Sequence, residues 1–235
     1  MNRVIFITGT RKGIGEELAK YYIRQHDHVI GCSRTIPEWS DDYSEDVYMH
    51  CLADVSNEAE VRDIFYIIKN TYGCLDVLIN NAGIASMNHA LLTPMSSVHK
   101  VLNTNVAGTF LCCREAAKLM RKKNKGRIVN FSTVAVPLNL AGEAVYAASK
   151  SAIVSLTHVL AKEFADFGIT VNAIGPVPIK TDLIRGVSEE KINALIDQQA
   201  IKRFGTFEDI ENVMDFFLSE RSDFVTGQVV YLGGV

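Results

Sequence analysis

Long apolar runs, paired cysteines and a surplus of one charge are all missing from this 235-residue chain. Because no run of about eighteen apolar residues occurs, we expect no membrane-spanning helix. The first apolar run, Val4–Ile7, is also too short for the core of a secretory signal. The five cysteines form no Cys-x-x-Cys pair and no metal-ligand spacing with histidine. They therefore predict reduced thiols in the cytoplasm and no metal site.

The charge is nearly balanced, with 24 basic and 27 acidic residues and a formal net charge of -3. Domains that bind DNA or RNA usually carry a basic face, so we expect no nucleic-acid partner. Apolar residues make up 48% of the chain, which is enough for one large core.

Short apolar runs alternate with helical patterns along the whole chain. This alternation is typical of βαβ units, and runs that are apolar at consecutive positions are typical of a parallel sheet covered on both faces. The sequence therefore predicts one α/β domain over residues 1–235, a doubly wound (Rossmann) parallel sheet. The expected strands are Val4–Ile7, Val29–Gly31, Val47–Leu52, Asp76–Asn80, Arg127–Phe131, Thr170–Ile174 and Val229–Leu232, and the expected helices span 14–25, 57–72, 96–122, 146–166 and 206–219.

Residues 178–205 interrupt this alternation. The segment is rich in charge and holds one short helical piece near Glu189–Gln199. An insertion at this place often supplies substrate contacts, and a solvated connection is the other interpretation that the sequence leaves open.

A glycine-rich loop follows the first strand. Gly9, Gly13 and Gly15 have the spacing G-x-x-x-G-x-G and open the first helix. Glycines allow a tight turn that brings backbone N–H groups against a pyrophosphate, and the positive end of the helix dipole favours that anion. The loop therefore predicts nucleotide binding, with a plain strand–helix turn as the alternative.

The position after the second strand selects the nicotinamide cofactor. NAD-dependent proteins of this architecture usually place an acidic residue there, whereas this chain has Ser33 and Arg34. A carboxylate would repel a 2′-phosphate, and a guanidinium pairs with it. Arg11 and Lys12 add positive charge in the glycine-rich loop. These residues favour NADP(H) over NAD(H); the alternative is that the cations are solvated surface residues.

A tyrosine and a lysine stand four residues apart in the helix expected at 146–166. Tyr146 and Lys150 therefore emerge from one helix face. A phenol has a pKa of about 10, and a nearby ammonium stabilises the phenolate and lowers that pKa. The phenol can then exchange a proton with a carbonyl or alcohol oxygen. Taken alone, such a pair is more often a simple surface pair.

Five motifs in order along the chain resemble the short-chain dehydrogenase/reductase family. They are the glycine-rich loop, Asn80-Asn81-Ala82-Gly83 after the fourth strand, Asn105 in a helix, Tyr146-x-x-x-Lys150, and Thr226-Gly227-Gln228 before the last strand. The resemblance covers the whole chain and is nearest to the single-domain 3-oxoacyl-carrier-protein reductases.

The resemblance implies a set of site residues. The catalytic residues would be Asn105, Thr133, Tyr146 and Lys150, with Asn105 holding a water linked to the lysine. The cofactor would contact Gly9, Arg11, Lys12, Gly13, Ile14, Gly15, Ser33, Arg34, Asp54, Val55, Asn81, Ala82, Gly83, Tyr146, Lys150, Pro176, Ile179 and Thr181, with Asp54 against the adenine and Thr181 against the carboxamide.

Two positions depart from the family pattern. Thr133 replaces the usual serine and keeps the hydroxyl, with one more methyl group and a stiffer side chain. Ser132 is the alternative hydroxyl, although on a strand it should point to the opposite face. Val177 replaces a glycine, and a β-branched residue would be strained in any turn that needs a positive φ. We therefore expect a consequence for cofactor affinity at Val177.

The resemblance implies an NADPH-dependent oxidoreductase that interconverts a 3-oxoacyl-type or related small ketone and its alcohol. It also implies a homotetramer or homodimer. An acyl carrier protein could present the substrate. Asn124 and Phe167 stand where carrier-protein reductases place docking arginines, and Lys122, Lys123 and Lys125 offer substitute charge at the first position.

Two alternatives to this function stay open. One is a reductase of a sugar or secondary-metabolite ketone. The other is a non-enzymatic NADP(H)-binding sensor or scaffold, because a fold does not fix a function.

Overall fold

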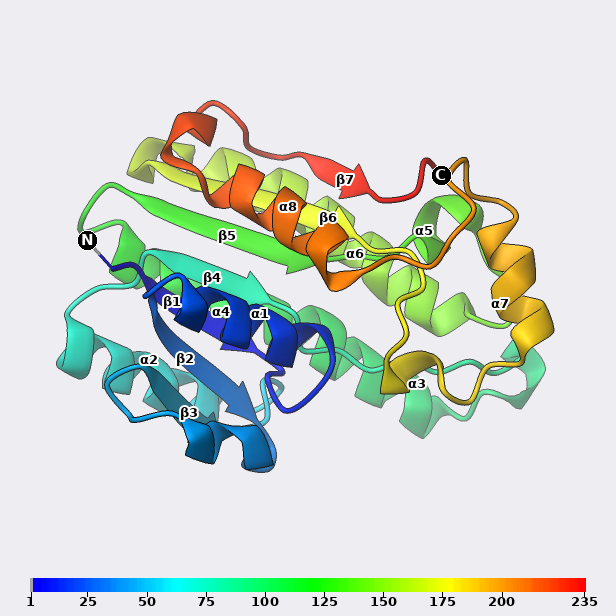
Figure 1. The fold of residues 1–235 in the computed structure, drawn as a ribbon, viewed down its shortest axis with the longest axis horizontal. Coiled ribbons are helices and arrows are strands. Elements are labelled where there is room, and N and C mark those ends of the chain that lie inside the picture. Colours follow the sequence, from blue (N-terminus) through cyan, green and yellow to red (C-terminus); the bar gives the residue numbers. More distant parts are fainter. Residues whose placement is uncertain (1) are drawn as a thin grey trace.

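Seven strands form one parallel sheet in the order β3-β2-β1-β4-β5-β6-β7 (Figure 1). The computed structural model describes residues 2–235, apart from the side chain of Leu183. The strands are β1 (Val4–Thr8), β2 (His28–Ser33), β3 (Tyr48–Leu52), β4 (Val77–Asn80), β5 (Gly126–Phe131), β6 (Ile169–Gly175) and β7 (Val229–Tyr231). The predicted doubly wound parallel sheet is therefore confirmed.

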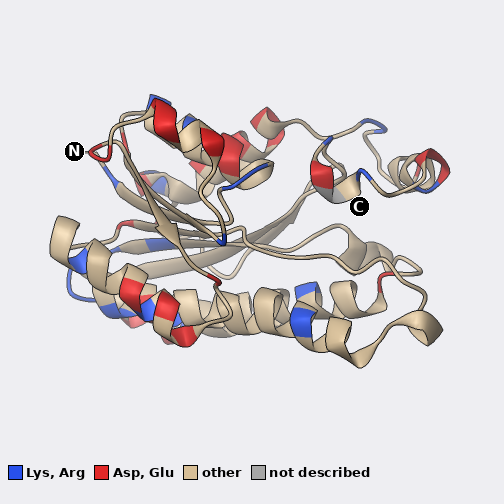
Figure 2. Ribbon diagram, turned by 90° about the horizontal axis from the view of Figure 1, so that it is seen from below, with Lys and Arg blue, Asp and Glu red and all other residues tan. Residues whose placement is uncertain are grey.

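Helices cover both faces of this sheet (Figure 1). The helices α1 (Ile14–Arg24) and α8 (Phe207–Leu218) pack on one face, and α2 (Glu58–Tyr72), α4 (Gly108–Met120) and α6 (Ala144–Glu163) pack on the other. Shorter elements lie in the connections: α3 (Met95–Leu102), α5 (Ala135–Leu138), α7 (Glu189–Ile196), and the 3-10 turns η1 (Glu38–Asp42), η2 (Ala90–Leu92), η4 (Ala165–Phe167), η5 (Asp182–Ile184) and η6 (Glu220–Ser222). Charged residues lie mainly on the outer faces of the two helical layers (Figure 2).

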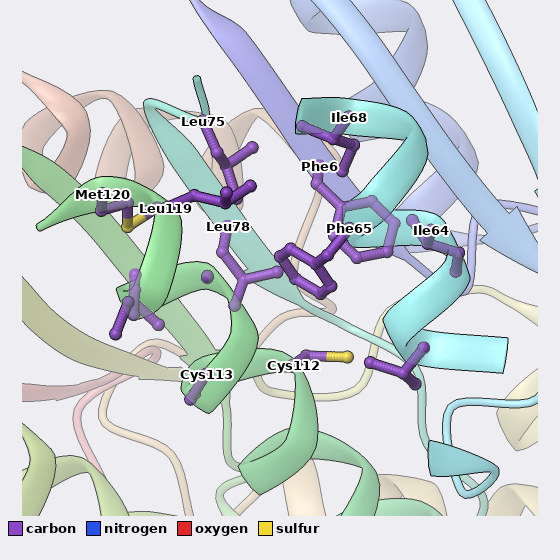
Figure 3. Packing of buried hydrophobic residues seen from close by; sticks show 14 of the residues in the cluster. Phe6, Ile64, Phe65, Ile68, Leu75, Leu78, Cys112, Cys113, Leu119 and Met120 are labelled. Atoms are coloured by element: carbon purple, nitrogen blue, oxygen red, sulfur yellow. The ribbon is translucent and has the colours of Figure 1, made fainter. Parts of the chain in front are cut away.

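Strand β1 shows why the strands are apolar at consecutive positions. Phe6 points to the layer of α2 and α4, where its ring meets that of Phe65 edge-on at 5.4 Å between centroids (Figure 3). Ile5 and Ile7 point to the opposite layer, formed by α1 and α8. Burial of a side chain of this size contributes about 1.5–3 kcal/mol. The sheet is therefore held between two apolar cores.

The single helix expected at 96–122 is three elements in the structure. The α-helices α3 and α4 are separated by a π-helical turn, η3 (Asn103–Ala107). Such a turn holds one residue more than an α-helical turn and often marks a functional site. The apolar periodicity of the segment predicts its helical character but gives no sign of this insertion.

Helix α6 is 20 residues long and apolar enough to cross a membrane by length and composition alone. It packs against β5 and β6, and it carries the buried polar residues Lys150 and Thr157. One such helix is weak evidence for a membrane span, because core helices of globular domains pass the same criterion. Its packing identifies α6 as a core helix of this domain.

Candidate active site

The candidate site lies at the carboxyl ends of the strands. The strand order reverses between β1 and β4, and in open α/β sheets the ligand crevice forms at such a switch point. An open cleft lies here. Of the residues predicted from the sequence, it is lined by Ile14, Asn81, Gly83, Thr133, Tyr146, Lys150, Pro176, Ile179 and Thr181.

The glycine-rich loop has the backbone that its sequence predicts. Gly9 has φ +75° and Gly13 has φ +68°, which are left-handed conformations that residues with a Cβ rarely adopt. A Cβ on Gly15 would lie 2.3 Å from the carbonyl oxygen of Gly9. Gly13 is the N-cap of α1 and has no side chain to occupy the first amides of that helix. The loop therefore leaves a compact N-terminus that is suited to an anion.

The loop after β4 is fastened to the glycine-rich loop. Asn81 Nδ2 donates to the carbonyl oxygens of Thr8 (2.9 Å) and Gly9 (3.1 Å). The backbone N–H of Ala82 donates to Thr8 Oγ1 at 2.9 Å. These bonds connect the ends of β1 and β4. Asn81 and Ala82 therefore hold the first residues of the glycine-rich loop in place.

Arg34 and Lys12, both predicted to bind the 2′-phosphate, differ in whether their charge is already paired within the protein. Arg34 is exposed just beyond β2, where its charge helps to lower the pKa of Asp54. Burial raises that pKa, but two hydrogen bonds from Ser56 and the charges of Arg34 and Lys100 outweigh burial. Lys12 instead forms an ion pair with Asp182 at 2.7 Å. The positive charge of Lys12 is therefore already paired, while that of Arg34 remains available.

Val55 faces the protein interior. Its side chain is buried, and a Cβ on Gly108 of α4 would lie 2.8 Å from Val55 Cγ2. Val55 can therefore offer a ligand only its backbone.

Tyr146 and Lys150 lie one turn apart on α6, and both are buried. Burial raises the pKa of Tyr146 to about 12; the nearby Thr133 hydroxyl partly offsets this, and the charge of Glu143 adds to it. Burial also lowers the pKa of Lys150 to about 8. Its Nζ donates to the carbonyl oxygen of Phe131 at 2.8 Å.

The expectation that Lys150 lowers the pKa of Tyr146 is therefore wrong for the protein as it stands. The two side chains share a dehydrated site, and dehydration disfavours the phenolate and the ammonium alike. The tyrosine consequently keeps its proton at neutral pH. The Tyr-x-x-x-Lys spacing predicts the shared helix face, but it does not show how deeply that face is buried.

The two candidate hydroxyls after β5 point to different partners. The Thr133 hydroxyl lies near the Tyr146 side chain and acts to lower its pKa, and Thr133 Oγ1 accepts from the backbone N–H of Ala135 at 3.3 Å. Ser132 Oγ donates to the backbone carbonyl of Lys150 at 3.4 Å. Both residues line the cleft, with Thr133 near the tyrosine and Ser132 bonded to the backbone of α6.

Asn105 lies in the π-helical turn and is fully buried. Its Oδ1 accepts from the N–H of Ile84 at 2.9 Å, and its Nδ2 donates to the carbonyl of Ile84 (2.9 Å) and to Ser149 Oγ (3.0 Å). A Cβ on Gly83 would lie 3.4 Å from both Asn105 Oδ1 and Lys150 Nζ. Asn105 therefore ties the loop after β4 to α6 directly beside the lysine.

The strain expected at Val177 does not occur. Among residues 2–235, the non-glycine residues with positive φ are His26, Asn124 and Asn139. A Cβ on Gly205 would lie 2.8 Å from Val177 Cγ2, and one on Gly233 would lie 2.7 Å from Cγ1. The valine fits because two glycines elsewhere in the chain leave room for its methyl groups.

Several residues that line the cleft are not predicted from the sequence. Met87, Leu140, Glu143 and Ile184 also line the cleft. Glu143 stands three residues before Tyr146, so helical spacing alone could have placed it on the same face. The other three come from loops whose course the sequence does not predict.

Comparisons with known proteins cover nearly the whole chain. A family model described as "Enoyl-(Acyl carrier protein) reductase" matches residues 9–234. A 3-oxoacyl-[acyl-carrier-protein] reductase of Staphylococcus aureus is 30% identical over 240 residues, covering 100% of this chain and 98% of that protein. A short-chain type dehydrogenase/reductase of Picea abies is also 30% identical, over 99% of this chain and 91% of that protein. The solved structure of ElxO with NADP bound has a TM-score of 0.90 and 32% identity, covering 99% of this chain and 97% of the other.

Burial of Lys150 predicts a lysine that titrates near pH 8. Carbon NMR of protein carrying isotope-labelled lysine should show one side-chain resonance with a midpoint near 8, and Lys150→Met should remove it. The folded protein releases this proton at a lower pH than the unfolded chain does. The free energy of unfolding should therefore rise, relative to Lys150→Met, as pH increases from about 8 toward the ordinary lysine pKa. An ordinary lysine midpoint for every resonance would contradict the prediction.

Proposed function

The chain belongs to the short-chain dehydrogenase/reductase family, and from that premise we propose that it reduces a small ketone with a proton supplied by Tyr146. It is an NADP(H)-dependent oxidoreductase, as the similar 3-oxoacyl reductases and the NADP-bound structure indicate. The observation that carries the proposal is that Tyr146, Thr133 and Lys150 line one cleft, with Thr133 near enough to the phenol to act on its pKa.

The glycine-rich loop fits the cofactor. A side chain at Gly9 or Gly15 would fill the space in which the loop approaches its neighbours, and the N-terminus of α1 is suited to a pyrophosphate. Arg34 would hold the 2′-phosphate, and Ser33 and Asp54 lie at the ends of the adjacent strands. When bound, the nicotinamide supplies the hydride.

The residues of the chain supply the proton. A pKa of about 12 keeps Tyr146 protonated at neutral pH, which is the form that donates to a carbonyl oxygen. The hydroxyl of Thr133 would hold the same oxygen in place. Lys150 is held against the end of β5 by its bond to Phe131, and Asn105 ties the loop after β4 to Ser149 of α6.

We propose a 3-oxoacyl-type or related small ketone as the substrate. Presentation by a carrier protein is restricted by the geometry. Lys122, Lys123 and Lys125 precede β5, whereas Thr133 follows its far end. The six residues of β5 span about 20 Å. A carrier docked on these lysines therefore lies at the amino ends of the strands, whereas the cleft of the same chain lies at their carboxyl ends.

We also propose that the protein is a homo-oligomer, with a tetramer as the first expectation. Leu102, Phe110 and Val159 expose between 39% and 49% of their surface on the layer of α3, α4 and α6. Phe216 and Phe224 expose apolar surface on the other side of the sheet, at α8 and just after η6. Two separate apolar areas fit two kinds of symmetric contact. The free, mostly buried cysteines fit a reducing compartment such as the cytoplasm.

Light scattering should give the mass of four chains at micromolar concentration. Phe110→Glu should lower that mass to two chains or one, because a charge at a buried symmetric contact is duplicated by the symmetry. A monomeric mass for the unmodified protein would contradict the proposed assembly.

Arg34→Ala should weaken NADPH binding by about 10- to 150-fold, through loss of a charge-assisted pair, and leave NADH binding nearly unchanged. Lys12→Ala is the matched control, because Lys12 is already paired with Asp182. Titration of the fluorescence of each reduced cofactor measures both affinities. Equal affinity of the unmodified protein for NADPH and NADH would sink the assignment of Arg34.

Tyr146→Phe should lower turnover by about 10²–10⁴-fold, the range of a positioned acid–base group, with NADPH affinity retained. Thr133→Ser should be tolerated because the hydroxyl remains, and Thr133→Val should be severe despite its similar shape. The assay follows absorbance of NADPH with a 3-oxoacyl thioester, and the matching enoyl thioester tests the reaction named by the family model.

Two outcomes would change the proposal. If Ser132→Ala abolished activity and Thr133→Val did not, Ser132 would be the catalytic hydroxyl. If Tyr146→Phe and both hydroxyl variants were silent, the cofactor-binding sensor would replace the reductase.

A further inference from the structure

Glu143 is an acidic side chain inside the candidate active-site cleft. It is the residue before α6 and stands three positions before Tyr146, so the two side chains emerge from neighbouring points of one helix face. Both line the same cleft, together with Thr133. The carboxylate therefore lies in the same cleft as the proposed proton donor, near enough for its charge to act on the pKa of Tyr146.

Helix capping does not explain this carboxylate. Glu143 is the N-cap residue of α6, but its side chain makes no capping hydrogen bond. Within the described part of the chain, burial and the charge of Lys191 are the influences on its pKa, with no hydrogen bond among them. The carboxylate thus has no donor of its own in the protein.

The surroundings of Glu143 are mostly apolar. Met87, Val134, Leu140 and Ile184 line the same cleft, and Glu143 itself is half-buried. Burial raises the pKa of its carboxyl group, and Lys191 on α7 only partly offsets this. A charged group that loses water without gaining a partner is costly. A ligand that brings a hydrogen-bond donor would therefore supply the partner that the protein itself does not provide.

We propose that Glu143 makes this enzyme prefer, among otherwise similar small ketones, those that carry a hydrogen-bond donor, a hydroxyl or an ammonium group, next to the carbonyl carbon. The same carboxylate excludes ketones that carry a carboxylate at that place. This inference rests on the proposed function and narrows its substrate class. Of the ketones that the sequence left open, it favours hydroxylated ones, and it admits a 3-oxoacyl group as a neutral thioester but not as a free acid.

The size of the effect follows from the chemistry of the pair. A hydrogen bond to a charged acceptor changes an equilibrium by about 10- to 150-fold. Because the pair forms in the bound substrate as well as in the transition state, the preference should appear mainly in KM. A substrate carboxylate placed beside the Glu143 carboxylate should raise KM by a similar factor.

The test uses four methyl ketones that differ in one group: hydroxyacetone, aminoacetone, butanone and acetoacetate. For the unmodified protein with NADPH, kcat/KM should be highest for the hydroxyl and ammonium compounds, lower for butanone and lowest for acetoacetate. Glu143→Gln should reduce the advantage of aminoacetone over butanone at least tenfold and raise the rate with acetoacetate. Hydroxyacetone should be affected less, because the amide oxygen still accepts its hydrogen bond. Glu143→Leu should remove both preferences.

Glu163→Gln is the matched control. It lies at the exposed far end of α6 and should leave all four ratios unchanged. Turnover of butanone reports the proposed reductase activity independently of Glu143. If butanone is reduced but the four ratios are the same in Glu143→Gln as in the unmodified protein, the specificity inference is overturned and the reductase stands.

A second measurement does not need turnover. Calorimetry with the same four compounds in the presence of NADP⁺ measures their binding directly. Tighter binding of the hydroxyl and ammonium compounds, lost in Glu143→Leu, supports the inference. Equal affinity for all four overturns it, including the case in which no ketone is reduced and the proposed function fails separately.

Discussion

The crevice between β1 and β4 depends on the hydrogen bonds that fasten one loop to the other. Asn81 binds the backbone of Thr8 and Gly9, and Thr8 in turn accepts from Ala82. These bonds fix the N-terminus of α1 relative to the loop that carries Gly83. Asn105 then holds the far side of that loop against α6. The position of the glycine-rich loop relative to α6 is therefore set by hydrogen bonds from the side chains of Thr8, Asn81 and Asn105.

Burial governs the chemistry of the site. Tyr146 and Lys150 are both removed from water, which raises the pKa of the phenol and lowers that of the ammonium. In such surroundings a single charge acts more strongly than it does at the surface. Glu143 is the acidic group that opposes loss of the tyrosine proton. Burial thus keeps Tyr146 protonated, and it also makes the site sensitive to the charge of its ligand.

Local patterns predict most of the fold and part of the site. Consecutive apolar residues in β1 predict a sheet covered on both faces, and helical spacing predicts that Tyr146 and Lys150 share a face. Packing between distant segments is not visible in such patterns. The room for Val177 comes from Gly205 and Gly233, the partner of Lys12 lies 170 residues away, and the shifted pKa values follow from burial by several elements at once.

The π-helical turn at Asn103–Ala107 rotates α4 about the helix axis relative to α3. Each residue of an α-helix turns the chain by about 100°, so one extra residue rotates everything that follows by that angle. Cys112, Ala116 and Met120 reach the sheet core from this rotated position. Deleting one residue of the turn would straighten the helix and swing these side chains toward solvent. The fit of α4 against the sheet and the placement of Asn105 beside Lys150 are therefore set by the same inserted residue.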